Sequence, residues 1–400
     1  MASSLATLTG RLSDAVDGYG KRSSPSDAQR KQILALANQI AAEVSNPLEK
    51  IDDYLANMME MAALRLLMDW DVFDKIPREP ESISYAALSA KVDTEERLLR
   101  RMAWMLVSRG LLRQVGEDRV AHTKLSPIFA ERESYALWFK FCYDNRGFVA
   151  SRWPKYFARY GRKEPVNTTH DNPVSFAHGK DDKSFWDIID GESLQDFITS
   201  MTVLSKICPN VGIFPFRWIV ENMDMVLPDA AIVVDVGGSY GEALQDIREE
   251  CPEIAPDRMV LQDRPPVIEK VERQDPPGLK GMKKMSHDFF TEQPVKGALV
   301  YFLRKVLHDC SDKDCRTILG HIKDAMASES RVLIYETILS NPPPFKTAVA
   351  DLAMMNMGAM ERTEKDWDQL LKSAGLQIVK IWRTERSGEH AVIECKKLEA

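Results

Sequence analysis

The segment AIVVDVGGSYG, residues 231–241, constrains the fold of this chain more than any other stretch. Its first six residues are apolar apart from Asp235, which predicts a strand buried on both faces. Gly237, Gly238 and Gly241 then predict a tight turn into a helix. The N–H groups at such a helix start can approach a nucleotide-type ligand, and the glycines leave room for it. An ordinary tight turn would show the same glycines. The neighbouring segments therefore have to distinguish a ligand-binding turn from a purely structural one.

The chain from about residue 209 onward alternates strand-like and helix-like segments. This order predicts an α/β fold whose mostly parallel sheet is covered by helices on both faces. Seven strands are expected, near residues 231–236, 258–262, 281–286, 298–303, 331–336, 377–383 and 391–395. The carboxyl ends of the parallel strands should therefore share one edge of the sheet, where ligands of such folds bind.

Residues at the ends of the second and third strands fit an adenosine-bearing ligand. Asp263 ends the second strand and can accept hydrogen bonds from two ribose hydroxyls. Asp288 follows the third strand and can accept from an adenine amino group, while Phe289 covers a ring face. Together these positions favour an adenosine-bearing cofactor. A nicotinamide-dependent oxidoreductase is the weaker alternative, because no Tyr-x-x-x-Lys pair stands where such an enzyme needs it.

A candidate proton acceptor follows the fourth strand. Of the seven histidines, two are expected at this edge of the sheet, His287 and His308. His287 is flanked by the adenine-type pair Asp288 and Phe289, which leaves His308 as the candidate. Glu336 ends the next strand, and Glu361 precedes a helix that Thr363 should cap. Two carboxylates at one edge can hold an imidazole in its working tautomer. We therefore predict a catalytic role for His308, although a histidine there can also serve only as a local hydrogen bond.

Composition and charge exclude several classes of protein. The 400 residues are 44% hydrophobic and 28% charged, without an uncharged apolar run of membrane-spanning length, so two or three globular domains are expected. The start of the chain lacks a secretory pattern, which predicts a cytoplasmic setting. The six cysteines contain no Cys-x-x-Cys pair, so neither a disulfide framework nor a metal site is expected. A net charge of -7 argues against a nucleic-acid partner.

The N-terminal part is predicted to be helical. Residues 84–130 read as a winged helix, with two helices followed by a hairpin across Gly116, Glu117 and Asp118. Such modules often bind DNA, but the acidic chain favours another role. The Leu- and Met-rich residues 48–70 predict packed core helices, with a substrate wall or a dimer interface as the alternative.

A third segment, residues 135–208, is rich in aromatic residues. Ordinary helix packing accounts for them at least as well as an aromatic substrate pocket does. The candidates for lining such a pocket are Phe176, His178, Phe185 and Trp186.

From Ser84 to its end, the chain resembles the caffeate-type or hydroxyindole-type family of S-adenosylmethionine-dependent O-methyltransferases, especially its fungal secondary-metabolite members. The resemblance implies a Rossmann-like class I methyltransferase domain with a mostly parallel seven-stranded sheet, preceded by an all-helical and winged-helix dimerisation domain. The implied domains are 1–130 for dimerisation, 131–208 as a helical connection lining the substrate pocket, and 209–400 for cofactor binding and catalysis. A homodimer acting on a phenolic hydroxyl of an aromatic, polyketide-derived metabolite is expected.

The same resemblance assigns roles to individual residues. It implies that S-adenosylmethionine is bound by Asp235, Gly237, Gly238, Gly241, Asp263, Asp288, Phe289 and Arg304. His308 falls on the family's catalytic base, with Glu336 and Glu361 on its supporting acids. Cys310 stands where many relatives carry Trp, which should alter packing more than chemistry. Some members catalyse dehydration or pericyclic reactions with the cofactor bound, but the presence of the three catalytic-type residues argues against that alternative here.

Overall fold

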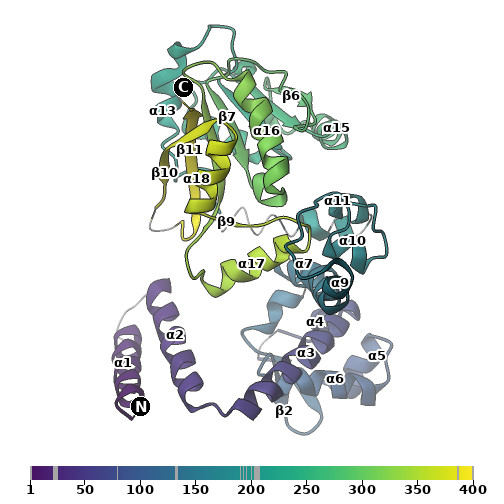
Figure 1. Cartoon of the computed structure of the whole chain (residues 1–400). Coiled ribbons are helices and arrows are strands. Elements are labelled where there is room, and N and C mark those ends of the chain that lie inside the picture. The colour runs from purple at the N-terminus through teal and green to yellow at the C-terminus, as the bar shows by residue number, and fades with distance from the viewer. Residues whose placement is uncertain are drawn as a thin grey trace. The chain divides into compact units, whose positions relative to one another are not determined.

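The computed structural model forms two compact units, Met1–Glu131 and Arg132–Ala400. It describes residues 2–20, 26–78, 80–130, 134–189, 191, 193–194, 196–199, 201, 208–384 and 387–398 (Figure 1). The first residues of the predicted connection 131–208 and those just before its end, 131–133 and 202–207, lie outside the described residues, and the division into three domains stays a prediction. None of the described helices is long and apolar enough to cross a membrane.

The first unit contains the predicted winged helix. Its elements are α1 (Ala2–Gly20), α2 (Asp27–Val44), α3 (Pro47–Asp69), α4 (Val72–Lys75), β1 (Ile83–Ser84), α5 (Tyr85–Lys91), α6 (Glu96–Ser108), β2 (Leu112–Val115), β3 (Arg119–His122) and the 3-10 turn η1 (Ser126–Phe129). The hairpin is confirmed, since β2 pairs antiparallel with β3. A two-residue strand that the sequence did not predict, β1, completes the sheet beside β3.

Helix α3 departs from its prediction. It begins as expected for a capped helix, with Asn46 and Glu49 forming a capping box around Pro47. Its buried residues, however, are confined to the C-terminal half: Ala63, Leu64 and Leu67. The apolar side chains left exposed are Leu48, Ile51, Tyr54, Leu55, Met58, Met59 and Met61. The predicted packed core is therefore wrong for most of α3, whose apolar face is uncovered in the single chain.

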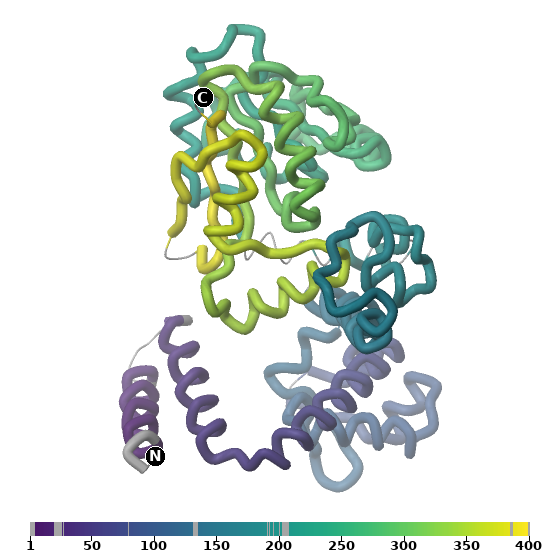
Figure 2. Tube along the Cα trace, in the orientation of Figure 1, coloured from purple at the N-terminus to yellow at the C-terminus, as the bar shows by residue number. Residues whose placement is uncertain are grey.

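The second unit begins with short helices around an aromatic core. They are α7 (Ser134–Phe141), the π-helical turn η2 (Cys142–Gly147), α8 (Phe148–Ala150), α9 (Trp153–Tyr160), α10 (Pro173–Ala177) and α11 (Phe185–Ile188). Helix α17 (Phe345–Met355) lies beside this group, as its packing with these helices requires (Figure 2). Phe141, Val174 and Met354 belong to one buried cluster. The aromatic segment is thus packed against residues far along the chain.

The rest of the second unit is the predicted α/β sheet. Its strands are β4 (Val233–Val236), β5 (Met259–Asp263), β6 (Lys283–Ser286), β7 (Val300–Arg304), β8 (Arg331–Leu339), β10 (Leu376–Trp382) and β11 (His390–Lys397), in the order β10-β11-β8-β7-β4-β5-β6. All seven predicted strands are present. The short β9 (Arg362–Thr363), which was not predicted, pairs with β8 as an eighth strand. In the seven-stranded order, β11 pairs antiparallel with both of its neighbours, β10 and β8. The other neighbouring strands pair in parallel.

Helices cover both faces of this sheet. They are α13 (Arg217–Asn222), α14 (Glu242–Glu250), α15 (Pro265–Gln274), α16 (Asp312–Ala325) and α18 (Glu364–Ser373), with 3-10 turns η3 (Met223–Met225), η4 (Pro256–Arg258), η5 (Pro277–Leu279) and η6 (Leu307–Asp309). Successive residues of β4 point to opposite faces, because Val234 packs with α16 and α18 whereas Val233 packs with α14 and α15. Each fully buried valine contributes about 1.5–3 kcal/mol. The sheet edge therefore rests on a core that is packed from both sides.

The glycine turn after β4 is required by the packing beneath it. A Cβ on Gly238 would lie 2.4 Å from Asp235 Oδ2 and 2.5 Å from Leu261 Cδ1. Gly237 and Gly241 have φ of +73° and +78°, which side chains other than glycine rarely adopt. The sequence suggested room for a ligand as the reason for these glycines. The structure supplies a different one, namely internal crowding and left-handed backbone.

Gly238→Ala should lower the free energy of unfolding by about 1–3 kcal/mol, because the added methyl group overpacks the turn. Gly320→Ala is the matched control. Gly320 lies in α16 with nothing within 4 Å of its added Cβ, so that substitution should be neutral or slightly stabilising. Urea denaturation of both variants tests this, and equal stabilities would contradict the packing explanation.

Candidate active site

Asp235 supports the glycine turn from below. Its side chain is 1% exposed, and Oδ2 has no hydrogen-bond partner among the described residues. Burial raises its pKa to about 7, with Asp263 adding to the effect and Arg304 opposing it. A buried carboxylate oxygen without a donor is costly. Gly238 packs directly on this carboxylate. Direct contact between Asp235 and a cofactor therefore stays a prediction.

Asp263 lies at the mouth of the same turn. Its Oδ2 accepts a hydrogen bond from Ser239 N at 2.9 Å, and its Oδ1 accepts one from Arg264 N at 2.8 Å. Burial raises its pKa, and these two backbone bonds oppose the shift. Each carboxylate oxygen accepts up to two hydrogen bonds, so one position on each oxygen remains for the hydroxyls of a diol.

The segment that follows β6 also contacts this turn. His287 N donates to Asp263 O at 2.9 Å, which ties the ends of β5 and β6 together. The ring of Phe289 comes within 3.8 Å of the position that a Cβ on Gly237 would take. Asp288 is exposed, and its Oδ1 accepts from Phe290 N at 3.0 Å. The residues predicted at three strand ends are therefore brought together around one turn.

Arg304, at the end of β7, lies next to this group. Its Nη2 donates to Cys208 O at 2.7 Å, and its guanidinium lies over the Tyr335 ring at 5.1 Å. Its positive charge opposes the raised pKa of Asp235. An unpaired buried oxygen, a diol-sized acceptor and an aromatic ring at one turn fit an adenosine-bearing cofactor.

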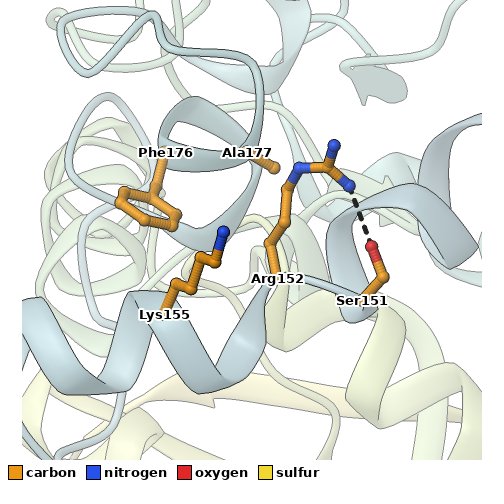
Figure 3. A pocket seen from close by; sticks show the side chains of 5 residues that line it. All are labelled: Ser151, Arg152, Lys155, Phe176 and Ala177. Carbon is orange, nitrogen blue, oxygen red and sulfur yellow. Dashed lines mark hydrogen bonds between the residues drawn. The ribbon is translucent and has the colours of Figure 1, made fainter.

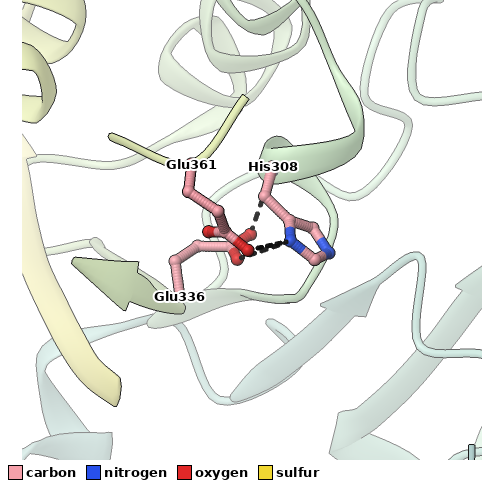
Figure 4. A group of neighbouring side chains, drawn as sticks. All are labelled: His308, Glu336 and Glu361. Atoms are coloured by element: carbon pink, nitrogen blue, oxygen red, sulfur yellow. Dashed lines mark hydrogen bonds and ion pairs between the residues drawn. The ribbon is translucent and has the colours of Figure 1, made fainter. Parts of the chain in front are cut away.

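His308 faces two carboxylates on the same edge of the sheet (Figure 4). It lies in η6, just before the Ser311 cap of α16. Its Nδ1 is 2.9 Å from Glu361 Oε1 and 4.0 Å from Glu336 Oε2. The bond to Glu361 assigns the proton to Nδ1, which leaves the Nε2 lone pair of the neutral ring to accept a proton. The predicted trio is thus assembled in one place.

Glu336 organises the backbone that carries His308. It is fully buried inside β8, which continues to Leu339 and does not end at Glu336 as predicted. Its Oε1 accepts hydrogen bonds from three successive N–H groups, those of Val306 (3.0 Å), Leu307 (3.0 Å) and His308 (3.3 Å). Glu336 therefore fixes η6 and adds a negative charge beneath the imidazole.

The charges around His308 determine its protonation. Burial alone lowers the pKa of His308, but the carboxylates of Glu336, Asp309 and Glu361 outweigh burial and raise the pKa to about 9. Conversely, burial raises the pKa of Glu361, but His308 outweighs that effect and the pKa is lowered. At neutral pH the cofactor-free protein therefore carries an imidazolium at this position.

Two charged neighbours of His308 were not predicted. Asp309 Oδ1 is 3.5 Å from His308 Nε2, and burial raises the pKa of Asp309 to about 6, with His308 opposing that shift. Lys305 Nζ is 3.7 Å from Glu336 Oε2 and 2.6 Å from Thr337 Oγ1. Lys305 also has φ of +54°, a strained value of the kind that gathers at functional sites. The sequence feature that could have identified them is the charge of Lys305 and Asp309 in the short segment between β7 and α16.

Buried contacts hold the segments that carry these groups. Arg362 is 1% exposed and donates to Leu307 O and Cys310 O, both at 2.9 Å. Asp351 Oδ1 accepts from Glu361 N at 3.0 Å. Cys310 is buried in the core next to α16, as its predicted packing role requires. The imidazole and its acids are thus pre-positioned by backbone hydrogen bonds.

The same trio could also bind a cation, which the sequence did not predict. Ligand atoms of His308, Glu336 and Glu361 all lie within 4.8 Å of one another. However, Glu336 Oε1 already accepts three N–H groups, and the ammonium of Lys305 lies beside Oε2. A positive charge at that distance disfavours a bound cation. The surroundings favour a protonated imidazole as the positive partner of these acids.

Val306 connects the two parts of the site. A Cβ on Gly237 would lie 2.9 Å from Val306 Cγ2, so this side chain packs directly on the glycine turn. Val306 is two residues from His308 and is held by Glu336. Val306 therefore joins the segment that carries the imidazole to the glycine turn of the predicted cofactor site by direct packing.

A separate cavity lies among the helices of the second unit. Its volume is about 380 Å³, and it is lined by Ser151, Arg152, Lys155, Phe176 and Ala177 (Figure 3). Phe176 is thus the one member of the predicted aromatic set that lines this cavity. Phe185 is buried in the cluster around α17, as helix packing requires. None of the residues predicted for catalysis or cofactor binding lines this cavity.

Comparisons with known proteins agree with this geometry. The family model described as the O-methyltransferase domain matches residues 184–377, and that of the O-methyltransferase dimerisation domain matches residues 52–132. Methyltransferase cfoD of Aspergillus candidus is 39% identical over 380 residues, which cover 93% of each chain. The crystal structure of OxaC in complex with SAH and oxaline has a TM-score of 0.86 at 25% identity, and the match covers 100% of each chain.

A second solved structure shares the fold alone. It is described as a pericyclic reaction enzyme, with a TM-score of 0.81 at 22% identity, and the match covers 99% of this chain and 100% of that one. The fold thus accommodates more than one chemistry.

The pKa of His308 can be measured directly. In the cofactor-free protein, its ring resonances should titrate near pH 9 in an NMR experiment, because three carboxylates favour the imidazolium. Since this pKa lies above the unfolded value of about 6.5, the imidazolium stabilises the fold fully below that pH, and its contribution is lost as the pH rises through about 9.

Glu361→Gln should move the midpoint for His308 towards about 6.5, because it removes one of the three charges. Glu364→Gln is the control, since Glu364 is exposed and pairs with Arg383. A wild-type midpoint already near 6.5, or no change in Glu361→Gln, would show that the carboxylates do not control this imidazole.

Proposed function

The chain belongs to the O-methyltransferase family, and on that premise we propose that it transfers a methyl group from S-adenosylmethionine to a phenolic hydroxyl of an aromatic secondary metabolite. The observation that carries the proposal is the imidazole of His308, bonded to Glu361 and fixed through Val306 to the glycine turn. This arrangement supports the proposal, because methyl transfer to a hydroxyl needs a proton acceptor beside the cofactor.

Residues at three strand ends would hold the cofactor. Asp263 is positioned for the ribose hydroxyls, Asp288 and Phe289 for the adenine ring, and the turn around Gly237 for the amino acid part. The bound cofactor supplies an electrophilic methyl group on a positively charged sulfur.

His308 acts as the general base in this proposal. Its Nδ1 proton is bonded to Glu361, so Nε2 accepts the proton of the acceptor hydroxyl. A pKa of about 9 is close to that of a phenol, about 10, which makes the transfer nearly balanced. It also means that the imidazolium must first lose its proton at neutral pH. A positive charge bound nearby lowers the pKa of His308 and so favours the neutral base.

A dehydratase or pericyclase that keeps its cofactor is the alternative. It is favoured by the solved pericyclic reaction enzyme of similar fold, although 22% identity supports no more than the fold. The assembled set of His308, Glu336 and Glu361 supports methyl transfer, because a base with two supporting acids serves the removal of a hydroxyl proton.

His308→Gln should reduce methyl transfer by about 10²–10⁴-fold, because the variant cannot accept the proton. Its affinity for S-adenosylmethionine, measured by isothermal titration, should stay within a few-fold of the wild type. His170→Gln is the control, since His170 is exposed on a loop. Full turnover in His308→Gln would remove the histidine from its role, whereas lost cofactor binding would indicate a binding role instead.

We also propose that the protein is a homodimer formed through α3. The exposed apolar side chains of this helix lie largely within the part matched by the dimerisation domain model. An uncovered apolar face of this length is typical of a protein–protein interface.

Light scattering after size exclusion should give twice the mass of the 45.4 kDa chain at micromolar concentration. Replacing Leu55 and Met59 by Lys should give monomers, because both side chains are more than half exposed one helical turn apart. Leu227→Lys, at an exposed site in the second unit, should remain dimeric. A monomeric wild type would contradict the proposal.

A further inference from the structure

Arg146 occupies an unusual piece of backbone in the second unit. It lies in η2, a six-residue π-helical turn between α7 and α8. Such turns are rare in helices and frequently mark functional sites. The sequence did not single out this arginine, because it lies in an aromatic-rich segment without a recognisable motif.

The guanidinium of Arg146 is in largely apolar surroundings. It lies over the Trp138 ring at 4.5 Å, and Trp138 belongs with Phe148 and Cys142 to the periphery of the cluster around α17. Burial lowers the pKa of Arg146, while Cys142 and Asp309 act in the opposite direction. Arginine remains charged even so, and the site therefore contains a partly desolvated cation.

This cation has no carboxylate within 4 Å among the described residues. The nearest acids in sequence are engaged elsewhere, because Lys140 Nζ lies 3.9 Å from Asp144 and 2.6 Å from Asp196. A largely buried cation without a carboxylate in direct contact is costly, and a bound anion would offset that cost.

Arg146 also belongs on the side of the site where His308 lies. The charge of Asp309 influences it, and Asp309 Oδ1 is 3.5 Å from His308 Nε2. The cluster that surrounds it continues through Met357 and Ala359 to the segment carrying Glu361. Asp309 therefore lies next to the Nε2 atom that would accept the acceptor's proton and close enough to Arg146 for their charges to interact.

We propose that Arg146 binds an anionic oxygen of the acceptor, a carboxylate or an enolate, next to the hydroxyl that is methylated. This inference rests on the proposed function and specifies its substrate class. The planar fork of arginine matches a carboxylate or a pair of neighbouring oxygens, and its binding is strongest where water is excluded. A purely structural role, stacking on Trp138, is the competing explanation.

The probes are 2-hydroxybenzoate and its methyl ester, which differ in one negative charge beside the same phenol. Binding of each is measured by isothermal titration to the full-length protein saturated with S-adenosylhomocysteine. The wild type should bind the acid about 10- to 100-fold more tightly than the ester. Arg146→Gln should abolish that difference by weakening the acid alone, and Arg146→Lys should restore part of it.

Arg152→Gln is the matched control, since it removes an arginine charge from the same helical region, where Arg152 lies over Phe148 and lines the separate cavity. It should keep the wild-type preference for the acid. Thermal melting verifies that each variant is folded.

The outcomes are distinct for the two proposals. Failure to bind S-adenosylhomocysteine would contradict the proposed function itself. If that binding is normal, then no binding of 2-hydroxybenzoate, equal affinity for acid and ester, or a preference that persists in Arg146→Gln would overturn the role of Arg146. Equal weakening of both probes in Arg146→Gln would assign it the structural role.

Discussion

The site depends on one buried carboxylate, that of Glu336. It lies inside β8 and accepts three successive backbone N–H groups, so a single side chain determines the path of the loop that carries His308. Removing a buried acceptor of this kind leaves several donors unsatisfied, each at a cost of about 1–3 kcal/mol. The same carboxylate raises the pKa of the histidine. Positioning and electrostatic tuning thus come from one residue.

The surrounding charges are arranged in opposition. Acids lie around His308. Among the cations, Lys305 lies beside Glu336, and Arg362 donates to the backbone carbonyls of Leu307 and Cys310 on either side of His308. This arrangement stabilises the imidazolium form of His308 in the cofactor-free protein. A positive charge bound nearby would lower the pKa of His308 and favour the neutral imidazole. If His308 is the base, as proposed, it is most effective once the cofactor site is filled, and cofactor binding is then coupled to proton acceptance.

Much of the second unit could be predicted because its signals are local. The glycine turn, the residues at strand ends and the capping box of Thr363 with Asp366 are each written within a few residues of sequence. Features that depend on distant partners could not be predicted. The apolar face of α3 was expected in a core, since composition does not show what covers a helix. Arg146 and Asp309 became candidates only when folding brought η2 and η6 into one unit.

The most direct test of the central claim is the fate of the cofactor's methyl group. The purified protein is incubated with S-adenosylmethionine bearing a CD₃ group and a panel of phenolic polyketides, and the small molecules are analysed by mass spectrometry. The account predicts a product that carries the deuterated methyl group on oxygen. Conversion of an acceptor by water loss or rearrangement, with the deuterated cofactor recovered intact, would contradict it.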